Sequence, residues 1–223
     1  MSPKAVVFDF DGTLIDTEAC ILRAQEILHG ELGLDYDAER WQAEIGSATH
    51  SAWATELALA TTHDFTASEI RNRRSALSLR FADELDLMPG MAALISEYRD
   101  AGIALGIASN SSRRWLYHHL DRLGISHQFS AVYTPEDVAH PKPAPDMFAE
   151  AAAALGSQPN DALAIEDSPS GATAAIAAGL RCAVLVSAHL NNAEYPAAAR
   201  VFASPRGLYL TELTSHWNSW SDV

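Results

Sequence analysis

The amino-acid sequence predicts an α/β fold, in which a core with a parallel sheet carries an inserted, all-helical cap. Two observations lead to this prediction. From residue 91 onward, patterns typical of helices and of buried strands alternate along the chain, which is the order that builds a parallel sheet. Between Leu14 and Pro89, amphipathic helical patterns follow one another without a convincing strand. We therefore expect a discontinuous core of residues 1–15 and 88–223 and a cap domain of residues 16–87.

The first predicted strand ends in two acidic residues. The stretch VVFDFDGTLIDTE covers residues 6–18, and Asp9 and Asp11 come directly after its apolar start. Because a strand alternates its faces, these two carboxylates should project to the same side of the sheet. Close like charges disfavour ionisation of one partner unless a cation or a proton intervenes. The pair therefore indicates a metal site, an acid and base that share a proton, or both.

The predicted cap contains three good amphipathic helical patterns, which cover residues 19–32, 48–60 and 68–81. The whole segment is far too long for a simple connection, so we interpret it as an insertion after the first strand. An insertion at this place is expected to cover an active site. His50 is the cap histidine of interest, because the turn GSAT before it could point toward that site.

The second half of the chain alternates clearly. Helical spacing over MAALISEYRDAG ends at Gly102, and the buried run IALGIAS follows it. In the next helix, SSRRWLYHHLDRLG, Trp115 and three leucines share a face. The remaining predicted elements are FSAVYT, DMFAEAAAALG, ALAIED, GATAAIAAGL and RCAVLV, which alternate between strand and helix. The tail SHWNSWSDV has no assigned structure, and we expect its tryptophans to pack on the body or on a partner subunit.

Composition limits the possible functions. The chain has 223 residues, 48% hydrophobic and 20% charged, which is enough to bury a proper core. Its formal charge of -14 and its lack of a basic stripe argue against nucleic acid and anionic membranes as partners. No signal peptide or membrane span is visible, and the two cysteines have no ligand or disulfide spacing, so we expect a cytoplasmic protein.

Four polar stretches follow predicted strands: DFDGT, ASNSS, HPKPAPD and IEDSPSG. In open parallel sheets, ligands bind beyond the carboxyl ends of the strands, so these stretches should form one cluster. Each of them alone is typical of turns, helix caps or solvated surface charge. The third stretch includes Lys142, which is informative because the only other lysine is Lys4.

The four stretches DFDGTLIDTE, ASNSS, KPAPDMF and IEDSPSGATAAIAAG resemble, in order and spacing, the signature motifs of the haloacid dehalogenase superfamily. Within it the chain is similar to the phosphatase and β-phosphoglucomutase-like branch, and only the tail lies outside the resemblance. The resemblance implies a Rossmann-like sheet core with a helical cap. It also implies phosphoryl transfer from a small phosphomonoester.

By this resemblance Asp9 is the nucleophile that forms an aspartyl-phosphate, and Asp11 is the acid that protonates the leaving oxygen and then activates water. The resemblance further implies Mg²⁺ as cofactor. Its protein ligands would be the Asp9 side chain, the Asp11 backbone carbonyl and Asp167, with Glu166 as a further ligand or as a support for the others.

The resemblance also assigns residues to the phosphate. Ser109 and Lys142 match the positions that bind and neutralise the transferring phosphoryl group. Thr13 should orient Asp9, Gly12 should let the backbone approach the phosphate, and Asn110 offers a further contact.

The sequence favours a magnesium-dependent phosphatase of a sugar, polyol or similar phosphate, and other functions remain open. A phosphomutase is disfavoured because Ile21 and Thr49 stand where β-phosphoglucomutases place a histidine and near their cap arginine. Dehalogenation is disfavoured by Asp11. A receiver-like signalling module that accepts phosphate on Asp9 is disfavoured by the large insertion. The substrate is open, and the protein is expected to be a monomer or a homodimer.

Overall fold

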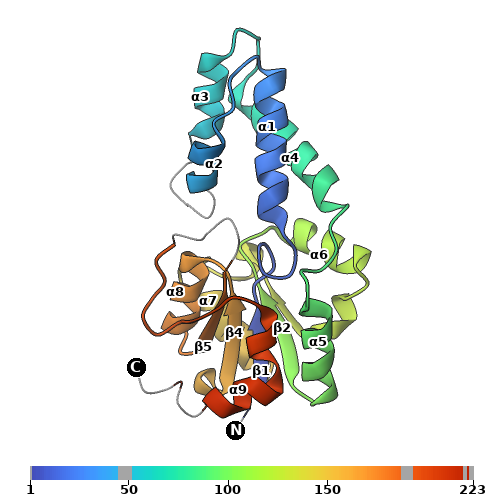
Figure 1. Ribbon diagram of the computed structural model, residues 1–223, viewed down its shortest axis with the longest axis vertical. Coiled ribbons are helices and arrows are strands. Elements are labelled where there is room, and N and C mark those ends of the chain that lie inside the picture. Colours follow the sequence, from blue (N-terminus) through green and yellow to red (C-terminus); the bar gives the residue numbers. More distant parts are fainter. Residues whose placement is uncertain (1, 45–51, 187–192, 218–219, 221–223) are drawn as a thin grey trace. The chain divides into compact units, whose positions relative to one another are not determined.

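The computed structural model describes residues 2–44, 52–186, 193–217 and 220. The chain divides into two compact units, residues 1–15 with 86–223 and residues 16–85. The larger unit holds the sheet, and the smaller unit, in its described part, is built from helices (Figure 1). The predicted α/β fold with a parallel sheet and a helical insertion is confirmed.

The sheet of the larger unit has six strands in the order β3-β2-β1-β4-β5-β6, and every neighbouring pair is parallel. β1, which carries the first acidic motif at its end, lies in the interior of the sheet between β2 and β4 (Figure 1). The strands are β1 (Ala5–Phe8), β2 (Ala104–Ala108), β3 (Ala131–Tyr133), β4 (Ala162–Glu166), β5 (Arg181–Leu185) and β6 (Arg200–Phe202).

Helices cover both faces of this sheet, because the central strand is apolar on both sides. Val7 belongs to a buried cluster with side chains of α7 and α8, among them Phe148 and Ala172. On the opposite face, Phe8 contacts the Tyr98 ring of α5 with 6.5 Å between ring centroids. Fully buried strands of this kind are typical of parallel sheets. The helices of this unit are α5 (Met91–Asp100), α6 (Arg113–Arg122), α7 (Asp146–Ala154), α8 (Pro169–Ala177) and α9 (Leu210–Trp217).

The smaller unit has its own aromatic core. His29 lies in it with its Nδ1 2.7 Å from the backbone oxygen of Gln25, and Trp41 donates its indole N–H to Nε2 of His29 at 3.2 Å. Trp53 packs edge-on against Trp41. The elements of this unit are α1 (Thr17–Glu31), α2 (Ala38–Glu44), α3 (Trp53–Ala60) and α4 (Ala67–Ala82).

Three elements were not predicted: α2, the edge strand β6 and α9. Trp217 of α9 is buried, and the guanidinium of Arg181 lies 4.0 Å from the centroid of its ring. Trp220 is buried as well and lies against Phe202 of β6. The tail tryptophans therefore pack on the body of the larger unit. Within the described part of the chain, no helix is both long and apolar enough to cross a membrane.

Candidate active site

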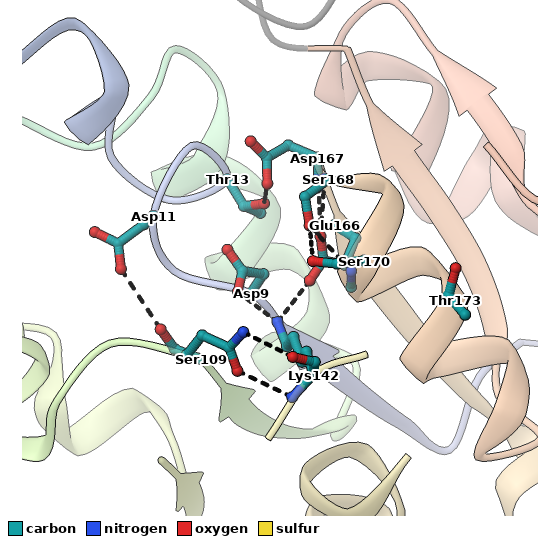
Figure 2. Close-up of polar contacts among 12 residues, drawn as sticks. Asp9, Asp11, Thr13, Ser109, Lys142, Glu166, Asp167, Ser168, Ser170 and Thr173 are labelled. Carbon is teal, nitrogen blue, oxygen red and sulfur yellow. Dashed lines mark hydrogen bonds and ion pairs between the residues drawn. The ribbon is translucent and has the colours of Figure 1, made fainter. Parts of the chain in front are cut away.

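The register of the sheet brings three of the predicted motifs together. Phe8 at the end of β1 pairs with Ile107 of β2 on one side and with Ile165 of β4 on the other. The residues that follow these three positions leave the sheet side by side, as expected at the carboxyl edge of parallel strands. They include Asp9, Ser109, Glu166 and Asp167, which are all buried (Figure 2).

Lys142 reaches the same place from the loop between β3 and α7. Its Nζ lies 2.5 Å from Oδ1 of Asp9 and 2.5 Å from Oε1 of Glu166 (Figure 2). Its ammonium also lies 4.8 Å from the centroid of the Phe148 ring. Burial alone would lower the pKa of Lys142, but the carboxylates of Asp9 and Glu166 outweigh burial and raise it. Lys142 therefore carries a positive charge at neutral pH.

The buried negative charge at the site exceeds this single positive charge. The carboxylates of Asp9 and Glu166 contact the one ammonium, and a carboxylate oxygen of Asp167 lies within 4.8 Å of oxygens of both; all of these residues are buried. Burial raises the pKa of Asp9 well above its usual value, the attraction of Lys142 opposes this rise, and Glu166 adds to it. Additional positive charge at the site would favour the ionised form of Asp9.

Glu166 is fixed at both of its oxygens. Oε1 accepts from Lys142, and Oε2 accepts from the backbone N–H of Asp167 at 3.0 Å and of Ser168 at 2.9 Å. The Ser168 hydroxyl also donates to Oε2 at 2.9 Å and accepts from the N–H of Gly171 at 3.0 Å, which caps the start of α8. A Cβ on Gly171 would lie 1.7 Å from Oε1 of Glu166, so only glycine leaves room for this carboxylate.

Asn110 supports the loop that carries Lys142. Its side-chain nitrogen donates to the backbone oxygen of Lys142 at 3.2 Å, and its side-chain oxygen accepts from the backbone N–H of Lys142 at 3.0 Å. Both polar ends of the Asn110 side chain are thus bonded to one residue. A contact of Asn110 with phosphate stays a prediction.

The turn after β1 is built around Asp167. Gly12 has a φ of 81°, a left-handed conformation that favours glycine, and a Cβ there would lie 2.0 Å from Oδ2 of Asp167. Thr13 is buried and its hydroxyl donates to Oδ1 of Asp167 at 3.4 Å, and its predicted role in orienting Asp9 stays a prediction. Tyr195 donates its hydroxyl to the backbone oxygen of Asp167 at 2.7 Å.

Asp11 points away from the group formed by Asp9, Lys142 and Glu166 (Figure 2). Its Oδ1 accepts from the indole N–H of Trp115 at 3.0 Å, and its Oδ2 accepts from the hydroxyl of Ser111 at 2.5 Å. The hydroxyl of Ser109 lies farther from Oδ2, at 3.5 Å. The two acidic residues of the first motif thus take different partners, although they are only two positions apart.

The acidic residues fit a hard divalent cation. Carboxylate oxygens of Asp9, Glu166 and Asp167 lie within 4.8 Å of one another, and all-oxygen donors are the ligands that Mg²⁺ and Ca²⁺ prefer. The excess of buried negative charge also favours a bound cation. Because the oxygens of Glu166 already accept four hydrogen bonds from the protein, Asp9 and Asp167 are the better placed ligands.

The structure thus brings eight predicted site residues into one region, and Asp11 lies at its border. Two residues of the predicted cap, Thr49 and His50, lie outside the described residues. Sequence reasoning did not single out the four supporting residues Ser111, Trp115, Gly171 and Tyr195. The eight are Asp9, Gly12, Thr13, Ser109, Asn110, Lys142, Glu166 and Asp167.

Comparisons with known proteins agree with this geometry. A family model described as haloacid dehalogenase-like hydrolase matches residues 3–179. Fructose-1-phosphate phosphatase YqaB from Escherichia coli (strain K12) is 31% identical over 175 residues, which cover 78% of this chain and 92% of that protein. Beta-phosphoglucomutase from Bacillus subtilis (strain 168) is 30% identical over 184 residues, which cover 79% of this chain and 80% of that protein.

A solved structure is similar over nearly the whole chain. The crystal structure of CbbY from Rhodobacter sphaeroides in complex with phosphate matches with a TM-score of 0.76 at 29% identity, covering 95% of this chain and 99% of that one. The matched family spans more than half of the chain and includes all four motifs. The chain therefore belongs to the haloacid dehalogenase-like hydrolases, and it is an enzyme of the phosphoric monoester hydrolase class.

Proposed function

We propose that the protein is a magnesium-dependent phosphatase that hydrolyses a small phosphorylated metabolite, a sugar, polyol or similar phosphate, through an aspartyl-phosphate on Asp9. The observation that carries the proposal is the convergence of Asp9, Lys142 and Asp167 from three distant segments of the chain. The names of the relatives, a fructose-1-phosphate phosphatase and a β-phosphoglucomutase, support the substrate class.

In the first step, a carboxylate oxygen of Asp9 forms a bond to phosphorus while the bond between phosphorus and the leaving oxygen breaks. Asp11 donates its proton to that leaving oxygen, which departs as an alcohol. Lys142, whose ammonium already contacts Asp9, stabilises the negative charge on the transferring phosphoryl oxygens, and the Ser109 hydroxyl donates to them.

In the second step, water attacks the aspartyl-phosphate. Asp11, now a carboxylate, accepts a proton from the water, the bond between phosphorus and Asp9 breaks, and inorganic phosphate leaves. Both aspartates return to their starting forms, so the cycle needs no other reactant.

The metal would be held by the side chains of Asp9 and Asp167 and the backbone carbonyl of Asp11. When bound, Mg²⁺ supplies positive charge that keeps Asp9 ionised and neutralises the phosphate. Glu166 acts through Lys142, which it fixes and keeps charged. The helical unit of residues 16–85 is proposed as the cap that selects the substrate.

The test is the release of inorganic phosphate from a panel of sugar and polyol phosphates, with Mg²⁺ and with a chelator. We expect release only with Mg²⁺, and no release by the Asp9→Asn variant. Asp161→Asn is the matched control, because Asp161 pairs with Lys4 at the opposite edge of the sheet and should keep full activity. Absence of release by the wild type on the whole panel, or full activity in Asp9→Asn, would contradict the proposal.

The same panel tests the phosphomutase alternative. A mutase converts glucose 1-phosphate into glucose 6-phosphate and keeps the phosphate on the sugar. We expect free phosphate instead, and sugar phosphate isomerisation without phosphate release would favour the alternative.

A further inference from the structure

The carboxylate of Asp11 is held at both oxygens by two side chains, one from the first turn of α6 and one from the segment just before it. Trp115 binds Oδ1 through its indole N–H at 3.0 Å, and Ser111 binds Oδ2 through its hydroxyl at 2.5 Å. The terminal torsion of an aspartate is otherwise broad and only weakly restricted. Two donors on opposite oxygens of one carboxylate restrict this rotation.

Trp115 is itself fixed by packing that leads back to the first motif. Its ring meets the ring of His119 edge-on, with 4.4 Å between centroids. His119 is fully buried and stacks on Phe10 with 6.3 Å between centroids and an interplanar angle of 27°. Phe10 is the residue between Asp9 and Asp11. The contacts thus lead from Phe10 through the rings of His119 and Trp115 to Asp11, the residue next to Phe10. This packing sets the direction of the indole N–H.

The two donors differ in a way that suits a group that gives and takes a proton. An indole N–H only donates, so the bond from Trp115 to Oδ1 persists whether Asp11 is protonated or not. A hydroxyl donates or accepts, so Ser111 can follow the proton on Oδ2. Oδ1 is thus held by a group that only donates, and Oδ2 by the hydroxyls of Ser111 at 2.5 Å and Ser109 at 3.5 Å.

We propose that Trp115 and Ser111 are positioning residues that orient Asp11 for proton transfer to the leaving oxygen and from water. This inference rests on the proposed function, in which Asp11 is the acid and base. Misplacing a reacting group by about 1 Å lowers rates by about 100-fold, so the loss of either hydrogen bond to Asp11 should have a measurable effect on proton transfer.

The test compares two aryl phosphates. p-Nitrophenolate leaves without a proton, whereas phenolate is a poorer leaving group and benefits from protonation by Asp11. In the Trp115→Phe variant, which keeps an aromatic ring and lacks the N–H, kcat/KM for phenyl phosphate should fall about 10- to 100-fold. The value for p-nitrophenyl phosphate should change by less than about twofold, because its first step needs no acid.

The second step gives an independent readout. Hydrolysis of the aspartyl-phosphate needs Asp11 as a base for every substrate. Trp115→Phe should therefore release one p-nitrophenolate per active site in a fast burst, followed by a slow steady state. Ser111→Ala should show the same selectivity and the same burst. A merely structural role of Trp115 would lower both kcat/KM values together and would give no burst.

Two further variants keep the test decisive. Trp217→Phe, a buried tryptophan of α9 that packs on Trp220 and Arg181, is the matched control and should behave as the wild type. Benzothienylalanine at position 115 keeps the shape of indole and lacks its N–H, so it should reproduce the effect of Trp115→Phe even if that variant folds poorly.

The outcomes separate the two proposals. An active wild type whose Trp115 and Ser111 variants show equal kcat/KM losses on both substrates, or no loss, overturns this inference and leaves the phosphatase intact. A wild type that hydrolyses neither aryl phosphate nor any sugar phosphate overturns the proposed function, and this inference falls with it.

Discussion

Replacement of Gly171 by alanine tests whether Glu166 supports the site. A glycine inside a helix usually destabilises it, so Gly→Ala in a helix is expected to add about 1 kcal/mol of stability. At Gly171 the new methyl would lie 1.7 Å from Oε1 and 2.0 Å from Cδ of Glu166, which is 0% exposed. Glu166 therefore has to move, and its hydrogen bonds have to break or lengthen.

The magnitude follows from what Glu166 loses. Its carboxylate accepts from Lys142 and, at 2.9 to 3.0 Å, from two backbone N–H groups and one hydroxyl. Each hydrogen bond to a charged group contributes about 1.5–3 kcal/mol. The loss of two of them, less the gain in helix propensity, gives a net destabilisation of about 2–5 kcal/mol. For a chain of this length, that lowers Tm by about 4–20 °C.

Thermal unfolding followed by circular dichroism measures this change, and phosphate release measures its effect on the site. The control is Gly30→Ala in α1, where an added Cβ meets nothing within 4 Å, so Tm should stay the same or rise. We also expect Gly171→Ala to be much less active than Gly30→Ala, because the partner of Lys142 is displaced. A Gly171→Ala protein as stable and as active as the wild type would refute the role assigned to Glu166.

Two other predictions concern the charges around Lys142. Lys142→Met leaves the buried carboxylates of Asp9 and Glu166 without their ammonium, so it should lower the free energy of unfolding, measured in urea, by about 3–5 kcal/mol. Adding Glu166→Gln to this variant should recover part of the loss. Strictly additive effects of the two substitutions would contradict an interaction between Lys142 and Glu166. Because the folded state raises the pKa of Asp9, it binds that proton more tightly than the unfolded state, so the contribution of Asp9 to the stability of the chelated protein is present below its unfolded pKa of about 4 and is lost as pH rises through its folded pKa. In chelator, the Tm of the Asp9→Asn variant should therefore exceed that of the wild type by an amount that grows from pH 5 to pH 8. Adding Mg²⁺ should make this difference smaller. A difference that does not vary with pH would contradict the raised pKa of Asp9.

The fold was predictable where the chain repeats a strong pattern. The elements from α5 to β5 combine helices of regular apolar spacing with fully buried strands such as Leu163–Ile165, and their alternation permits one simple assembly. β6 was missed because it is a three-residue edge strand with Val201 53% exposed, so it has no apolar run. α2 has only 7 residues, too short for a clear period, and no structure was assigned to the residues of α9.

The site was predictable in its members and less so in their contacts. Strand ends brought Asp9, Lys142 and Asp167 together as expected, because the sheet fixes where those ends lie. The hydrogen bond from Thr13 to Asp167 was not predicted, since a hydroxyl near two carboxylates has no local signal that selects one of them. Trp115 was assigned only to the apolar face of its helix, and its N–H reaches Asp11 across 104 positions of sequence. Trp115 stands at no strand end and in no polar stretch, so no pattern in the sequence singled out its indole as a partner of Asp11.

The placement of β1 between β2 and β4 has a consequence for synthesis of the protein. Asp9 is synthesised 133 positions before its ammonium partner, and Glu166 follows a further 24 positions later. A nascent chain that ends before β4 therefore lacks Glu166 and Asp167, and its strand β1 lacks one of its two pairing neighbours. Products that stop before β4 are therefore expected to be inactive and to associate through the unpaired edge of β1.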